Sequence, residues 1–195
     1  QECRVKACGR YYPERVDDVA WENDLTAFRA YGPALQETGE RAFGYDIWTK
    51  YNTTEPVVEA RYEGELNPDM KAKITELGKT DPKAAQELYR SVSYHVDHGN
   101  GLDCYKVGPT LGGGTTALMA GDTIIYPYCY ATQEILDNGP LRFTVKLVYN
   151  PLVVKGDSTI IETRIITLDA GSYCNKTVVS YTNLKETMPL AVGFV

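Results

Sequence analysis

The sequence has little of several informative features. It contains only two histidines and two tryptophans among 195 residues, and 20 Lys and Arg residues against 26 Asp and Glu residues, a formal net charge of -6. Nucleic acid is therefore disfavoured as the main partner, because phosphate binding needs clustered positive charge. Its uncharged apolar runs are far shorter than the ~20 residues that cross a bilayer as a helix, so we expect no membrane span.

Cysteines are few and scattered. The five thiols form no CxxC pair, so the usual structural zinc pattern is missing. Their number is odd, which leaves at least one without a partner in the chain. Free cysteines are most often small buried hydrophobes, and we expect that here while leaving the disulfide state open.

Length and composition are those of an ordinary globular chain. Hydrophobic residues make up 43% and charged residues 24%, which excludes a disordered or collagen-like chain. At 195 residues, a single domain over 1–195 is the default expectation. Fifteen tyrosines against four phenylalanines stand out. Tyrosine suits half-buried strands and ring-stacking surfaces with access to water.

Strand-like patterns dominate the chain. Alternation or aromatic enrichment marks residues 26–31, 45–50, 57–62, 144–149, 158–168 and 176–181, and turn residues separate the later runs. Residues 68–93 differ, because Asp81-Pro82 is a helix start and Ala84, Ala85, Leu88 and Val92 recur at helical spacing. No GxGxxG motif is present. We predict a mainly β fold, an antiparallel β-sandwich or large curved sheet, with two short helices inserted at about 68–93.

The two histidines lie close together in the segment from Tyr94 to Asp103. His95, Asp97 and His98 are followed by Gly99 and Gly101, and ionisable groups beside a glycine-rich loop are typical of active sites. Histidine suits proton transfer and metal binding. Three interpretations stay open, namely a proton-transfer site, a divalent-metal site with too few ligands to name the metal, and a polar loop with a structural histidine.

A second cluster spans Asp17 to Pro33. It combines Trp21, Glu22, Asn23, Asp24 and Arg29. Carbohydrate sites use such residues, with an aromatic face for the sugar ring, polar groups for hydroxyls and Arg for a carboxylate. The alternative is an acidic loop in which Trp21 is a core anchor.

Long stretches of the chain resemble a known family. Residues 13–35, 45–62 and 94–114 are similar to signature blocks of the DUF 4861 family, and the DNGPLRFTVKLVY and TLDAG stretches fit as well. Family members are longer, so the chain resembles a central segment of one. The resemblance implies a galactose-mutarotase-like β-sandwich. It also implies a periplasmic or secreted role in polysaccharide breakdown in Bacteroidota, above all of uronic-acid polymers.

The resemblance also groups the candidate site residues without assigning their roles. It places the Trp21–Arg29 residues named above in one motif and His95, Asp97, His98, Asp103 and Tyr105 in another. From these motifs, and from Trp48 of the 45–62 block, we take two sets of candidates. The catalytic set is His95, His98, Tyr105, Arg29 and Glu22, and the substrate-binding set is Trp21, Asn23, Asp24, Asp97, Asp103 and Trp48.

The leading hypothesis is a lyase or dehydratase that acts on uronic-acid oligosaccharides. Arg29 would bind the carboxylate, His95 or His98 would take the proton, and Tyr105 would return one. No cofactor is required by this scheme, although a divalent metal stays an alternative.

Other functions remain open at this stage. A mutarotase or epimerase would pair a histidine with Glu22 or Asp24, and a glycoside hydrolase would pair Glu22 with Asp103. A binding module without turnover would use Trp21 and the tyrosines as a sugar platform. Neither the sugar nor the oligomeric state can be deduced from the sequence.

Overall fold

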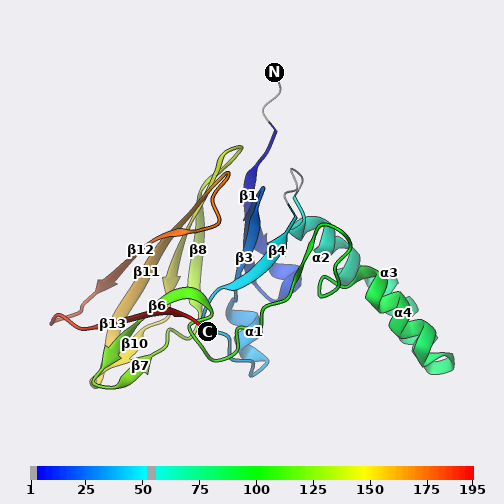
Figure 1. Ribbon diagram of the computed structural model, residues 1–195. Helices are drawn as coiled ribbons and strands as arrows, with labels where there is room; N and C mark the ends of the chain where they lie inside the picture. Colours follow the sequence, from blue (N-terminus) through cyan, green and yellow to red (C-terminus); the bar gives the residue numbers. More distant parts are fainter. Residues whose placement is uncertain (1–3, 52–55) are drawn as a thin grey trace.

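A five-stranded antiparallel sheet occupies the centre of the molecule (Figure 1). The computed structural model describes residues 4–51 and 56–195. The strands of this first sheet lie in the order of the chain and are β1 (Ala7–Tyr12), β2 (Asp18–Asn23), β3 (Thr26–Ala30), β4 (Asp46–Lys50) and β5 (Gly101–Asp103). The 26–31 and 45–50 runs are therefore strands, as predicted.

The C-terminal half forms a second and a third sheet. The second has the order β10-β11-β9-β8, with β12 on the other side of β11, and the third has the order β13-β6-β7. Their bounds are β6 (Gly113–Ala120), β7 (Thr123–Ile125), β8 (Tyr130–Gly139), β9 (Arg142–Tyr149), β10 (Leu152–Val154), β11 (Asp157–Asp169), β12 (Lys176–Thr182) and β13 (Leu190–Phe194). The runs at 144–149, 158–168 and 176–181 correspond to β9, β11 and β12.

The first and second sheets pack face to face. Trp21 and Phe28 from the first sheet meet Phe143, Leu147 and Ile166 from the second in one buried cluster. Alternation in β9 and β11 turns their apolar side chains toward this cluster. The prediction of a mainly β, antiparallel sandwich is confirmed.

Three helices cover the outer face of the first sheet or project from it (Figure 1). They are α2 (Val58–Leu66), α3 (Pro68–Thr80) and α4 (Pro82–Val92); a short helix α1 (Pro33–Glu37) and a 3-10 turn (Pro13–Arg15) lie elsewhere. The two helices predicted within 68–93 are confirmed as α3 and α4. The Asp81 side chain caps α4 by accepting a hydrogen bond from the backbone N–H of Ala84 at 3.0 Å.

The strand prediction for residues 57–62 was wrong, because this segment enters helix α2. Val58 and Tyr62, four residues apart, are both buried in a cluster with Trp48 of the first sheet. The carboxylate of Glu22 accepts hydrogen bonds from the backbone N–H groups of Val57 and Val58 at 2.8–3.0 Å. A distant strand thus supplies the cap, because the N-cap residue Val57 has no side chain that could accept these hydrogen bonds.

Both faces of strand β2 are covered, and this decides where the Asp17–Asp24 cluster lies. All six residues of β2 are buried, so the cluster is not a solvated loop. Trp21 points to the second sheet. Its neighbours Ala20 and Glu22 belong to the opposite face, which α2 covers.

The cysteines divide between interior and surface. Cys129 is buried, as expected of a small hydrophobe, but Cys104 and Cys174 are exposed, so that expectation fails for them. Within residues 4–51 and 56–195, no helix is long and apolar enough to cross a membrane.

Candidate functional site: a cleft beside His95 and a buried arginine

Arg29 lies on the outer face of the first sheet among three aspartates. The β3–β4 register places Asp46 directly opposite Arg29, and the two side chains form an ion pair. Nη2 of Arg29 also lies 2.7 Å from Oδ2 of Asp103 in β5, and Nη1 lies 3.8 Å from Oδ2 of Asp18 in β2. One guanidinium therefore serves carboxylates from three different strands.

Tyrosine hydroxyls and aromatic rings complete the surroundings of Arg29. The guanidinium donates to the hydroxyls of Tyr62 and Tyr31, at 3.2 Å in each case. The ring centroids of Trp48 and Tyr94 lie 5.5 and 5.6 Å from its central carbon. Arg29 is 3% exposed, so its hydrogen-bonding capacity is largely committed to the protein itself.

The negative charge of the three aspartates exceeds the single positive charge of Arg29. Burial raises the pKa of Asp18 to about 7 and the pKa of Asp103 to about 6, while Arg29 acts against both shifts. Asp18 Oδ1 is buried and has no hydrogen-bond partner among the described residues. Such an oxygen is cheaper to bury when the carboxyl carries a proton.

His95 lies at the rim of this cluster with its side chain 54% exposed. Its Nδ1 atom lies 3.1 Å from the backbone carbonyl oxygen of Asp103 and 3.6 Å from the Asp103 carboxylate. A carbonyl oxygen only accepts, so Nδ1 carries the hydrogen and Nε2 keeps a lone pair. The imidazole is thus held in the tautomer that can accept a proton at Nε2.

A cleft of about 690 Å³ opens beside His95, and we call it the His95 cleft. Its lining includes Arg29, Asp103 and Tyr105 from the predicted set, together with the positively charged residues Arg15, Arg41 and Lys106. Glu40 adds a negative charge to the lining. Neither Arg41 nor Lys106 forms an ion pair in the part of the chain that the structure describes. The cleft therefore presents positive charge that is free to meet an anion.

Two tyrosines of the cleft differ in what their hydroxyls can do. The Tyr105 hydroxyl donates to the carbonyl oxygen of Val195 and accepts from its N–H group, so both functions are in use. The Tyr31 hydroxyl accepts from Arg29, which leaves its own proton free. Burial raises the pKa of Tyr31 above its ordinary value, so this hydroxyl stays protonated at neutral pH.

Other predicted site residues lie outside the lining of the His95 cleft. His98 is exposed and contacts the carbonyl oxygen of Ser93 through Nε2 at 3.0 Å. Asp97 accepts from the Tyr51 hydroxyl at 3.0 Å and from the backbone N–H of Gly99. In the described part of the chain, neither His98 nor Asp97 contacts Arg29.

The Trp21–Asp24 residues are occupied by structural contacts. Trp21 is fully buried between the sheets, and Glu22 forms an ion pair with Lys50 at 2.6 Å. Asn23 donates to the carbonyl oxygens of Asp169 and Ser172, and Asp24 accepts from the N–H of Gly171. The contacts of Asn23 and Asp24 join the first sheet to the turn that follows β11.

Trp48 lies in the aromatic cluster beneath helix α2. Its ring stacks on Tyr94 with centroids 5.2 Å apart, and its indole N–H donates to Asp46. It therefore lies behind Arg29 rather than in the lining of the His95 cleft.

No group of three or more His, Cys, Asp or Glu side chains is placed to hold a metal ion within the described ranges. The suggested ligands His95, Asp97 and His98 do not converge. Asp97 binds the turn at Gly99, while the two imidazoles contact different backbone carbonyls.

Sequence reasoning did not single out Arg15, Tyr31, Arg41 or Lys106. Arg15 and Tyr31 lie within the 13–35 block, and Lys106 lies within the 94–114 block. The blocks therefore contained the signal for three of the four. Nothing local marks Arg41, because its place in the cleft depends on how the chain returns between α1 and β4.

Comparisons with known proteins identify the family but no activity. The chain is 30% identical over 175 residues to "Uncharacterized protein P7" of Formosa agariphila, an alignment that covers 86% of this chain and 38% of that protein. The chain thus spans about two-fifths of the relative's length. No solved structure matches the chain significantly. A family model described as "Domain of unknown function (DUF4861)" matches residues 2–195, and the chain belongs to this family.

Proposed function

We propose that the His95 cleft binds a uronic-acid-containing oligosaccharide and catalyses an elimination, as a lyase or a dehydratase. The observation that carries the proposal is the half-exposed imidazole of His95, fixed through Nδ1 on the carbonyl oxygen of Asp103. Its free Nε2 beside a positively charged cleft combines a base with a site for an anion.

The cleft's cations support a negatively charged sugar as substrate. Arg41 and Lys106 are exposed, and Arg15 is 20% exposed and lies 3.8 Å from Asp18. We assign carboxylate binding to these residues instead of Arg29, which three aspartates already surround. Arg29 then acts as a positioning residue, because it holds Asp103 and, through it, His95.

The proposed step is a β-elimination that needs no outside oxidant or reductant. Nε2 of His95 takes the proton on the carbon next to the carboxylate, and the resulting electron pair forms a carbon–carbon double bond. The bond from the next carbon to its oxygen substituent breaks, and Tyr31 donates a proton to that oxygen. The products are an unsaturated uronate and either a shortened chain or water.

The family resemblance supports a wider setting for this activity. From that resemblance we propose that the protein acts in polysaccharide breakdown, outside the cytoplasm of a bacterium. A non-catalytic saccharide-binding module is the alternative, because cations in a cleft bind an acidic sugar without needing to turn it over.

The test is to incubate the chain with a panel of uronic-acid oligosaccharides and to follow product masses. Loss of one water mass shows dehydration, and two fragments with no added water show lyase cleavage. Gain of a water mass shows hydrolysis and contradicts the elimination. Binding without a change in mass identifies a module, and the absence of both binding and turnover rejects the proposal.

A further inference from the structure

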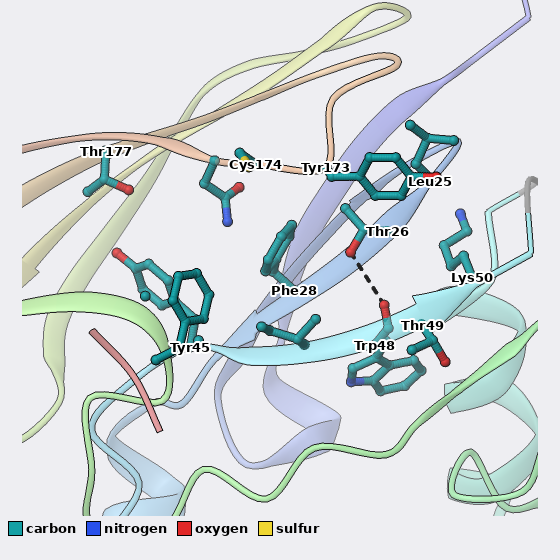
Figure 2. A pocket seen from close by; sticks show the side chains of 15 residues that line it. Leu25, Thr26, Phe28, Tyr45, Trp48, Thr49, Lys50, Tyr173, Cys174 and Thr177 are labelled. Atoms are coloured by element: carbon teal, nitrogen blue, oxygen red, sulfur yellow. Dashed lines mark hydrogen bonds between the residues drawn. The ribbon is translucent and has the colours of Figure 1, made fainter. Parts of the chain in front are cut away.

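A second cavity lies between the sheets, away from the His95 cleft. It encloses about 360 Å³ beside β4, the segment from Tyr173 to Thr177 and the start of β6. Figure 2 shows Phe28, Tyr45 and Tyr173 around this space. Where the structure describes the chain, the two cavities share no lining residue. Phe28 and Arg29 are successive residues of β3, so they point to opposite faces of the first sheet.

Aromatic rings form much of the cavity wall. Phe28 is held in place by stacking on Trp21 with centroids 5.9 Å apart. Tyr173 and Phe194 also line the cavity and are 70% and 75% exposed. The wall thus has a buried ring on one side and exposed rings on the other. Such aromatic rings pack well against the flat, C–H-rich face of a ligand.

A buried tyrosine hydroxyl lies at the inner part of the cavity. Tyr45 is 2% exposed, and its hydroxyl lies close to Arg164 and Thr177 but has no hydrogen-bond partner of good geometry among the described residues. A buried hydroxyl without a partner costs free energy unless a water or a ligand completes it. Thr177 lines the same cavity, and Figure 2 shows the Tyr45 hydroxyl on the side of the cavity where Thr177 lies.

The polar groups around the cavity are uncharged or already neutralised. Asn175 accepts from the indole N–H of Trp21 at 2.9 Å, and its amide nitrogen has no acceptor within residues 4–51 and 56–195. Among the described residues, Lys50 is the one cation of the lining, and it pairs with Glu22 at 2.6 Å. Within that part of the chain, an anion would find no free positive charge here, in contrast to the His95 cleft.

We propose that this cavity is a binding site for an uncharged sugar residue. The C–H face of the sugar would pack against Phe28 and Tyr173. The hydroxyls of the sugar would form hydrogen bonds with Tyr45 Oη and the Asn175 amide. Pockets of roughly 300 Å³ or more hold small ligands. The site is independent of the elimination at His95, so either proposal can fail alone.

The test is saturation-transfer NMR and calorimetry of the full chain with methyl glycosides of glucose, galactose, mannose, xylose and rhamnose. We expect saturable binding of at least one of them. Tyr45→Phe removes only the unpartnered hydroxyl and should weaken that binding roughly three- to tenfold, the range of one net hydrogen bond. Tyr173→Ala removes an exposed ring and should weaken it similarly, with little effect on stability.

Two control variants separate this site from the rest of the molecule. Tyr89→Ala removes a 40% exposed tyrosine on α4, and Arg41→Ala alters the His95 cleft; both should leave neutral-sugar binding unchanged. The proposal is overturned if none of the glycosides binds, or if Tyr45→Phe and Tyr173→Ala bind as tightly as the parent chain. It is also overturned if Arg41→Ala abolishes the binding, because the sugar would then occupy the cleft.

Discussion

Nδ1 of His95 lies 3.1 Å from the backbone carbonyl oxygen of Asp103, and the carboxylate of the same Asp103 lies 2.7 Å from the guanidinium of Arg29. The exposed imidazole is therefore tied through one residue to the most heavily buried charge cluster of the first sheet. This link explains how a loop residue can have a fixed orientation, and it suggests how to separate function from stability.

His95 and His98 provide a matched pair of variants. His95→Ala should lower turnover by about 10²–10⁴-fold, the usual loss on removing a general base. His98→Ala should retain turnover, because His98 does not line the cleft. Both residues are exposed, so we expect both variants to keep the parent free energy of unfolding to within about 0.5 kcal/mol. Equal turnover of His95→Ala and the parent chain would remove the base assignment.

Arg41→Ala and Lys106→Ala should raise KM for an acidic oligosaccharide while kcat changes little. A carboxylate bound equally in the ground and transition states contributes to KM alone. We expect KM to rise roughly three- to tenfold in each variant, and no more, because solvent screens these exposed charges. Lys73→Ala on α3 removes an exposed lysine outside the cleft and is the control. If all three variants give the same KM, the cations do not bind the substrate.

Arg29→Leu should destabilise the protein strongly. Removal of one partner from a buried ion pair leaves uncompensated charge and costs about 3–5 kcal/mol, and here three aspartates lose their shared cation. Arg142→Leu is the matched control, since its ion pair with Asp169 is about half exposed and exposed pairs contribute little. Urea unfolding of both variants measures the contrast, and similar losses would contradict the central role of Arg29.

The unfolding free energy should fall as the pH rises from 5 to 8. The raised pKa values of Asp18, about 7, and Asp103, about 6, mean that the folded state binds these protons more tightly than the unfolded state. Their stabilisation is complete below the unfolded pKa near 4 and is lost as the pH passes 6–7.

Asp18→Asn should reduce this pH dependence, because an amide does not titrate. Asp97→Asn is the control. The backbone N–H of Gly99 lowers the pKa of Asp97, so that carboxylate does not titrate between pH 5 and 8. Urea titrations of the three proteins at several pH values measure the slopes, and identical slopes for Asp18→Asn and the parent would refute the assignment.

Trp21→Ala should affect stability rather than saccharide binding in the His95 cleft. The side chain is fully buried between the two sheets, against Phe28 and Phe143. Large-to-small replacement of a buried aromatic residue costs about 3–5 kcal/mol. Thermal unfolding checks this loss. A variant that is stable but has lost binding in the cleft would restore the sugar-platform interpretation of Trp21.

The sequence by itself determined the elements whose signals are local. Period-2 alternation predicted β9, β11 and β12, because buried and more exposed side chains alternate along these strands, although the buried positions of β11 include Glu162 and Arg164. Asp81-Pro82 predicted the start of α4, because an N-cap and a following proline act within one turn. The blocks that carry the family resemblance could likewise be recognised from the sequence alone.

Only the tertiary structure decided which residues share a site. Strand β2 is buried on both faces, so its sequence does not reveal that Trp21 faces the core while Glu22 faces helix α2. Residues 57–62 form a helix because Glu22, 35 residues earlier, caps it and the first sheet buries Val58 and Tyr62. Arg29, His95 and Arg41 meet in one cleft because strand pairing brings together segments that are far apart in the chain, and no local spacing encodes that pairing.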